Sequence, residues 1–267
     1  MTSGSHVLLI VGELAAVTFL IGLLIGFVGA GGAGIAVAIL RTGFDLPAHT
    51  AIGTAIAAMF FVTISGAISH LREGNVAPRL GLVVGLSGAL GAVLGADTSQ
   101  TVDDHTLALA AGVALWGLAG LMWVRTRLTG SRAATREPVE HRDSASPSSP
   151  REWIAGITLG ATGGAAAAFF GVGMAPFLQL GLLTLHHLPL RQTVGTTMLV
   201  LAFVSGSGGA ALARHGDVSM PHLVGLTIGL ASGAYIGARF TRRAPRQLLR
   251  STVVTIPFAA GAMLLFL

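Results

Sequence analysis

The sequence predicts an all-α, polytopic membrane protein in which two inverted repeats supply about eight full transmembrane helices and two short half-helix or re-entrant segments. Three observations predict this class. The chain is 52% hydrophobic and only 10% charged, more apolar than a soluble domain of 267 residues. It repeats itself without a gap at an offset of 142 residues. Its basic residues, all arginine, gather in short connecting stretches, which is typical of topology signals.

The repeat runs from residue 27 to residue 96 and returns at 169–238. Glycine and alanine are common enough to match by chance, but paired proline, threonine, phenylalanine and arginine are not. The matches include Phe27 with Phe169, Pro47 with Pro189, Thr54 with Thr196, Ser65 with Ser207, and Arg72 with Arg214. Many transporter folds consist of two related halves with the substrate site at their junction, so the duplication favours transport.

A helix needs roughly 20 apolar residues to cross the hydrocarbon core. Suitable runs lie near 7–29, 48–69, 78–96, 105–124, 152–174, 190–213, 220–238 and 248–267. Two further apolar stretches, 33–43 and 175–186, are too short to cross and each follows a glycine cluster. We expect them to be half-helices, because broken backbone at membrane depth is tolerated only inside the protein.

The segment 125–151 carries six arginines among proline, serine and acidic residues. It predicts a cytoplasmic linker between a first transmembrane repeat, 1–124, and a second one, 152–267. Counting spans outward from this linker places Arg72 inside and its repeat partner Arg214 outside. The two copies are therefore predicted to be inverted in a multi-pass protein of the inner membrane, with the lipid bilayer around them.

The glycine clusters are the first candidates for a binding site. Gly29, Ala30, Gly31 and Gly32 precede one predicted half-helix, and Gly171 and Gly173 precede the other. A half-helix N-terminus near the midplane presents free N–H groups and a positive dipole end, which suit an anion. The alternative is that these glycines only let helices pack closely. A nucleotide site is disfavoured, since neither a preceding strand nor a Walker lysine accompanies them.

Hydroxyl side chains near the breaks extend this candidate site. Thr54, Thr196 and Thr197 lie near the beginnings of the next helices and could donate hydrogen bonds to an anion without adding charge. Ser65 and Ser207 lie deeper and are candidates for accessory roles. Serine and threonine in membrane helices also bond to their own helix carbonyls or bridge helices, so a structural role stands beside the functional one.

Titratable groups supply candidates for coupling. Glu13 is the one acidic residue inside a predicted span, although its position near the interface favours a solvated carboxylate. His49 flanks a helix end and could titrate in a proton-coupled cycle. No metal-ligand set, catalytic constellation or cofactor motif stands out, and the chain has no cysteine. Enzyme activity and nucleic-acid binding are therefore not expected.

These motifs in this order resemble the TauE/SafE family of membrane transporters, also called sulfite exporters. The likeness lies in the glycine clusters, Leu46-Pro47 and Leu188-Pro189, Gly53-Thr54 and Gly195-Thr196-Thr197, Ser65-Gly66-Ala67, Arg72-Glu73-Gly74-Asn75-Val76, and Gly88-Ala89-Leu90-Gly91-Ala92 with Gly95. The resemblance implies an inner-membrane carrier of sulfite or related organosulfur or carboxylate anions, coupled to protons or to the membrane potential. The chain departs from the family pattern at Gly34, where a proline is usual, and at Met174.

The sequence thus predicts a secondary transporter that moves a small anion by alternating access between the repeats. A passive anion channel on the same scaffold is the alternative. In either case the predicted site is the meeting point of the two glycine breaks.

Overall fold

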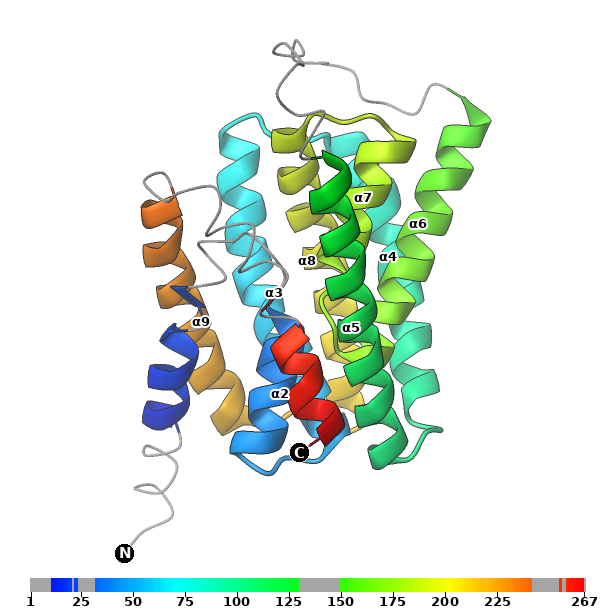
Figure 1. The fold of residues 1–267 in the computed structure, drawn as a ribbon. Coiled ribbons are helices and arrows are strands. Elements are labelled where there is room, and N and C mark those ends of the chain that lie inside the picture. Colours follow the sequence, from blue (N-terminus) through cyan, green and yellow to red (C-terminus); the bar gives the residue numbers. More distant parts are fainter. Residues whose placement is uncertain are drawn as a thin grey trace, which may run out of the picture.

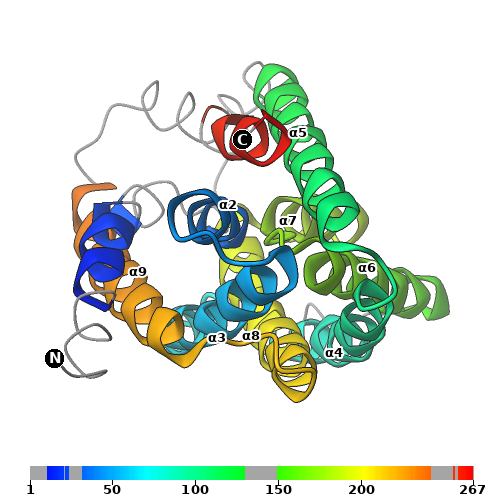
Figure 2. The same cartoon turned by 90° about the horizontal axis from the view of Figure 1, so that it is seen from below.

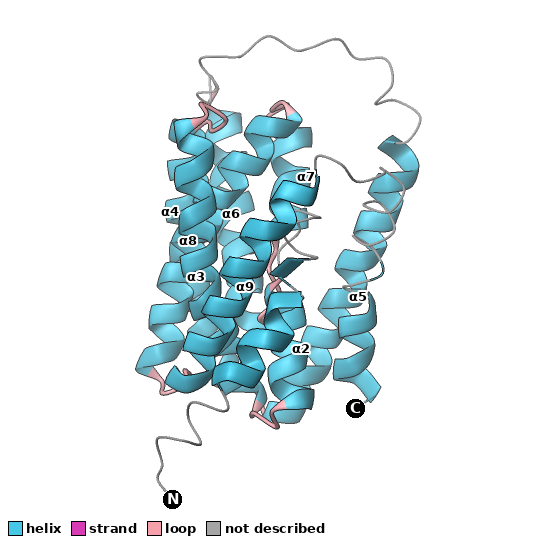
Figure 3. Ribbon diagram, turned by 90° about the vertical axis from the view of Figure 1, so that its left-hand side faces the viewer, coloured by secondary structure: helices cyan, strands magenta, loops and turns pink. Residues whose placement is uncertain are grey.

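In a computed structural model, the structure describes residues 11–20, 22–23, 32–129, 149–241, 255 and 258–266, and the regular structure among them is helical (Figure 3). The helices are α2 (Ala33–Gly43), α3 (Ala48–Arg72), α4 (Pro78–Ser99), α5 (Asp104–Thr129), α6 (Pro150–Phe170), α7 (Ala175–Leu185), α8 (Leu190–Arg214) and α9 (Met220–Thr241). Residues 11–20 and 258–266 are helical as well. The predicted all-α class is confirmed.

Five helices of the described chain are long and apolar enough to cross a membrane: Ala48–Arg72, Pro78–Ser99, Asp104–Leu121, Pro150–Phe170 and Gln192–Arg214. Each of these helices coincides with a span predicted from the sequence, and α9 coincides with a sixth predicted span. Helix α5 continues to Thr129, five residues beyond the predicted boundary at 124. Parts of the first and last predicted spans, and most of the linker, lie outside the described residues. The chain is thus a polytopic membrane protein.

The two predicted half-helices are present as α2 and α7, which have 11 residues each. Such a helix is about 16 Å long, about half of the hydrocarbon thickness. Pro176 lies in the first turn of α7, where its missing N–H costs no intrahelical bond. Leu46 N–H donates to the Leu40 carbonyl after α2, and Leu188 N–H donates to the Leu182 carbonyl after α7, so the same turn follows both half-helices.

Helices α2, α3, α7 and α8 occupy the centre of the bundle (Figure 2). On one side lie α9 and the helical residues 11–20, and on the other lie α4 and α6. Figure 1 shows that equivalent helices run in opposite directions: α3 ends at the upper side of the view, where α4 begins, whereas α8 ends at the lower side. Arg72 and Arg214, which end these two helices, therefore lie at opposite ends of the bundle.

Two contacts join residues that are 142 positions apart in the chain, which is the repeat offset. The Thr63 and Ser205 hydroxyls lie 3.3 Å apart where α3 and α8 cross. The Trp116 indole N–H donates to the Phe258 carbonyl at 3.1 Å, and the two rings stack. Equivalent residues meet in this way only on a two-fold axis, so these contacts are what two inverted copies would produce.

Glycines allow backbone-to-backbone contact between helices of different repeats. A Cβ atom on Gly91 of α4 would collide with the Ala161 carbonyl of α6, and one on Gly233 of α9 would collide with the Phe19 carbonyl. These two contacts are equivalent under the repeat. Small residues at such positions let membrane helices gain van der Waals contact without a hydrophobic driving force between them. Helix α4 of the first repeat therefore packs on α6, the first helix of the second repeat. In the same way, α9 packs on the helical residues 11–20 of the first repeat.

We predict that Gly91→Ala destabilises the protein by about 1–3 kcal/mol, because the new methyl group meets a backbone carbonyl that cannot move aside cheaply. Gly117→Ala is the matched control, since nothing lies within 4 Å of its Cβ position and alanine favours the helix. Thermal denaturation in detergent measures both. Equal denaturation midpoints for the two variants would contradict the packing described here.

Candidate functional site

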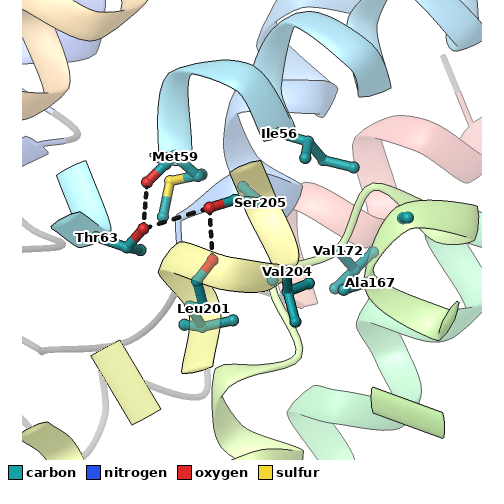
Figure 4. Close-up of a pocket in the computed structure, with 11 residues that line it drawn as sticks. Ile56, Met59, Thr63, Ala167, Val172, Leu201, Val204 and Ser205 are labelled. Atoms are coloured by element: carbon teal, nitrogen blue, oxygen red, sulfur yellow. Dashed lines mark hydrogen bonds between the residues drawn. The ribbon is translucent and has the colours of Figure 1, made fainter. Parts of the chain in front are cut away.

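A cavity of about 30 Å³ lies where the two repeats meet, near the middle of the long helices (Figure 4). Its lining is apolar apart from two hydroxyl groups and consists of Ala33, Ile56, Met59, Thr63, Ala167, Ala168, Val172, Gly173, Leu201, Val204 and Ser205. By the volume that one water centre needs, it has room for about two water molecules.

Both repeats contribute to this central cavity. Helix α3 supplies Met59 and Thr63, and α8 supplies their equivalents Leu201 and Ser205. The start of α2 and the break between α6 and α7 complete the wall. The cavity therefore lies on the pseudo-two-fold axis, next to both half-helices, where sequence reasoning expected the two breaks to face each other.

The hydroxyl pair is the polar feature of the cavity wall. Thr63 donates to the Met59 carbonyl at 2.8 Å, and Ser205 donates to the Leu201 carbonyl, one turn earlier in each helix. Each hydroxyl keeps free acceptor capacity toward the other, and both side chains are buried. Either hydroxyl can turn from its helix carbonyl toward a bound anion at little cost, because a hydrogen bond from a serine or threonine to its own helix is weak.

The half-helices begin beside the cavity. Gly32 and Met174 occupy the N-cap positions of α2 and α7, and no described side chain caps either start. The first N–H groups of a helix have no intrahelical acceptor, and the macrodipole gives that end a partial positive charge. Two such ends at one buried cavity favour negative charge there.

The glycines of the predicted site lie in different places in the structure. Gly29, Ala30 and Gly31 lie outside the described residues. Gly32 is buried at the start of α2, and Gly173 lines the cavity. Gly171 ends α6 with φ of 66°, a left-handed conformation that glycine adopts without strain, and a Cβ there would strike Ile52.

Thr54 and Thr196 form reciprocal hydrogen bonds between the repeats. Thr54 Oγ1 accepts from the Ser219 N–H at 3.0 Å, and Thr196 Oγ1 accepts from the Ala77 N–H at 3.0 Å. These backbone groups belong to the starts of α9 and α4, and the two bonds are equivalent under the repeat. Both threonines are fully buried but do not line the cavity. Their contact with an anion remains a prediction.

The remaining predicted residues lie away from the cavity wall. Thr197 donates to the Thr193 carbonyl, and Ser207 donates to the Ala89 carbonyl of α4. Ser65 is exposed on the outer face of α3, and Glu13 is exposed on the helical residues 11–20. His49 lies at the start of α3, where it contacts Asp104.

Sequence reasoning missed Thr63 and Ser205 as a pair. They are equivalent positions, but threonine faces serine there, so a search for identical residues passes over them. Comparing the repeats by side-chain chemistry, with any hydroxyl counted as a match, is the signal that would have found them.

A half-buried imidazole lies at the end of α7. Burial lowers the pKa of His186, outweighing the nearby Glu152 carboxylate, and His186 Nε2 has no hydrogen-bond partner among the described residues. The equivalent position in the first repeat is Phe44. At the start of α5, by contrast, the Thr106 N–H donates to the exposed Asp103 carboxylate and lowers its pKa.

A family model described as "Sulfite exporter TauE/SafE" matches residues 14–264. The chain belongs to the TauE/SafE family. It is 37% identical over 250 residues to "Probable membrane transporter protein YdhB" of Bacillus subtilis (strain 168), covering 94% of this chain and 98% of that protein. A "Probable membrane transporter protein" of Xylella fastidiosa (strain Temecula1) is 28% identical over 246 residues, covering 91% and 90%. No solved structure matches this TauE/SafE protein.

The family resemblance predicted from the motifs is thereby confirmed. With its apolar helices, the family assignment makes the chain a multi-pass membrane transporter.

We predict that Thr196→Val lowers the free energy of unfolding by about 1–3 kcal/mol, because it leaves the buried Ala77 N–H without an acceptor. Thr196→Ser keeps the oxygen and is the control. Thermal denaturation of the purified variants provides the measurement, and a valine variant as stable as the serine one would show that the bond is dispensable.

We predict that the stability of the protein falls as the pH drops below the usual histidine value of about 6.5, because the unfolded state binds the His186 proton more readily than the folded state does. His186→Phe copies the residue of the first repeat and should remove this part of the pH dependence. His187→Asn, at an exposed neighbour, should retain it. Denaturation midpoints between pH 5 and 8 test the difference.

Proposed function

We propose that this TauE/SafE protein is a secondary transporter of small anions, such as sulfite or organosulfur and carboxylate anions, that works by alternating access between its two repeats. The observation that carries the proposal is the central cavity, which both repeats line with equivalent residues beside two half-helices. Sites of this kind are typical of transporters built from inverted repeats.

The chemistry of the cavity favours an anion. The uncapped starts of α2 and α7 bring N–H groups and positive dipole ends, and Thr63 and Ser205 bring hydroxyl donors. Within the described part of the chain, the cavity wall has no charged side chain. Recognition by dipoles and hydroxyls holds an anion without the desolvation cost of burying a fixed charge.

The small size of the cavity favours a carrier over the alternative, a passive anion channel. A space for about two waters is closed to a solvated anion. Equivalent hydrogen bonds hold the two ends, with Thr54 and Ser219 at one and Thr196 and Ala77 at the other. Rocking of one repeat against the other would open one end at a time, whereas a channel needs both open together.

The arginines assign the sides of the membrane in this proposal. The linker and Arg72 face the cytoplasm of an inner-membrane protein, and Arg214 faces outward. The start of α3, the end of α2 and the start of α5 then form the outer end of the protein.

Uptake of labelled sulfite, sulfoacetate and small carboxylates into proteoliposomes tests the function. Saturable uptake with counterflow is expected of a carrier, and unitary currents in planar bilayers would instead establish the channel. Uptake no faster than in empty liposomes for every anion of the panel would overturn the proposal.

We predict that Thr63→Val combined with Ser205→Ala lowers kcat/KM for the transported anion by at least about tenfold, the effect of losing a hydrogen bond to a charged group. Ser65→Ala, on the outer face of the same helix, is the control and should transport normally. A double variant with unchanged kcat/KM would place the anion elsewhere.

A further inference from the structure

Three charged or titratable side chains meet at the outer end of the protein. Arg41 Nη1 of α2 lies 2.9 Å from Asp104 Oδ2 at the start of α5. The other carboxylate oxygen, Oδ1, accepts from the His49 backbone N–H at 3.2 Å and contacts His49 Nδ1 at 3.1 Å. The cluster therefore joins the end of α2 to the starts of α3 and α5.

The second ring nitrogen of His49 also faces an acceptor. Nε2 lies 3.1 Å from the backbone carbonyl of Ser99 at the end of α4. A carboxylate and a carbonyl can only accept, and a neutral imidazole has one N–H to donate. Only a protonated ring can donate to both of these acceptors at once.

The same cluster is mechanically connected to the central cavity. Arg41 lies in the last turn of α2, and the first residue of that half-helix, Ala33, lines the cavity. His49 begins the helix that supplies Met59 and Thr63 to the cavity wall. Loss of a hydrogen bond at His49 would loosen the outer ends of the two elements that must move for an anion to enter from that side.

Protons from the outer solution can reach His49. Its side chain is 18% exposed, and a surface depression, which we call the outer mouth, lies beside it. The described polar residues that line the outer mouth include Arg41, Thr42, Asp45 and Asp104. Of the nearby charged groups, Asp45 faces this depression, His105 follows Asp104 in the chain, and Asp97 at the end of α4 contacts His215 instead.

The second repeat has different residues at the positions that correspond to His49 and Asp104. The positions equivalent to His49 and Asp104 in the second repeat are Arg191 and Arg246. Arginine stays protonated at any physiological pH, so those positions cannot exchange a proton. The duplicated halves therefore differ in titratable chemistry, and only the outer end has a histidine and a carboxylate at these positions.

We propose that His49 is the proton-binding residue of this transporter: protonation from the outer side ties α2, α3, α4 and α5 together through Asp104 and Ser99 and holds their outer ends closed, and loss of the proton releases them. The inference rests on the proposed transport function and adds the coupling ion and the group that carries it. His49 acts through helix position and does not touch the anion.

A thiol at position 99, whose carbonyl contacts the His49 ring, tests whether the outer ends of these helices open, and this test needs no anion. Ser99 is fully buried, and the chain contains no cysteine, so Ser99→Cys introduces a single thiol. Its rate of labelling by a membrane-impermeant maleimide is divided by that of Thr101→Cys, an exposed reference thiol, at each pH. We expect this ratio to rise about tenfold from pH 6 to pH 8, the scale of one lost charge-assisted hydrogen bond.

His49→Gln in the Ser99→Cys protein should make the ratio independent of pH. His215→Gln is the matched control, because His215 also pairs with a carboxylate at this end, Asp97 at 2.9 Å, and should leave the rise intact. A ratio that is equal at pH 6 and pH 8, or a rise that persists in His49→Gln, would overturn the proposal.

Transport measurements distinguish a failure of proton coupling at His49 from a failure of the proposed anion transport. In proteoliposomes, an inside-alkaline gradient should accelerate uptake of sulfite or sulfoacetate by the unmodified protein, and His49→Gln should keep counterflow but lose the acceleration. Counterflow without any effect of the gradient on the unmodified protein overturns the proton coupling alone. A pH-dependent thiol in a protein that moves neither anion supports the proton site and refutes the anion class.

Discussion

The fold depends on one constraint: a backbone polar group inside a bilayer must find its partner within the protein. The starts of α4 and α9 expose such groups, and each repeat supplies a partner for the other. The Thr196 hydroxyl accepts the Ala77 N–H, and the Thr54 hydroxyl accepts the Ser219 N–H. The glycine before each threonine permits this approach, since a Cβ on Gly53 would strike the carbonyl of Asp217. Neither repeat could satisfy these groups alone.

This interdependence determines where the cavity lies. Glycine contacts between α4 and α6, and between α9 and the helical residues 11–20, hold the flanks of the bundle at short range. The centre is occupied by α3, α8 and the two half-helices. Between them lies the cavity, beside the starts of α2 and α7 and lined in part by the Thr63 and Ser205 hydroxyls. An anion bound there would be shared by the two repeats, which alternating access requires.

The two repeats share their backbone structure but differ in the side chains at several equivalent positions. The turns after α2 and α7 have the same hydrogen bond, and Asp45 and His187 adopt the same φ of 51° at equivalent positions. Side chains at other equivalent positions differ, such as Phe44 with His186 and His49 with Arg191. Symmetry in the backbone is what the two-sided motion of the proposed carrier needs, and the titratable side chains at equivalent positions differ between the two ends.

The sequence by itself determined the apolar spans, the position of both half-helices and the duplication, because hydrophobic length, glycine breaks and repeat offset are local properties of the chain. It also predicted a candidate site where the two glycine breaks meet, and this site remains a prediction. Only the tertiary structure decided that Thr63 meets Ser205 on the axis, that Thr54 and Thr196 accept bonds from the opposite repeat, and that His49 lies against Asp104. Those pairings join side chains from distant segments, and the packing of helices sets them rather than any pattern within one helix.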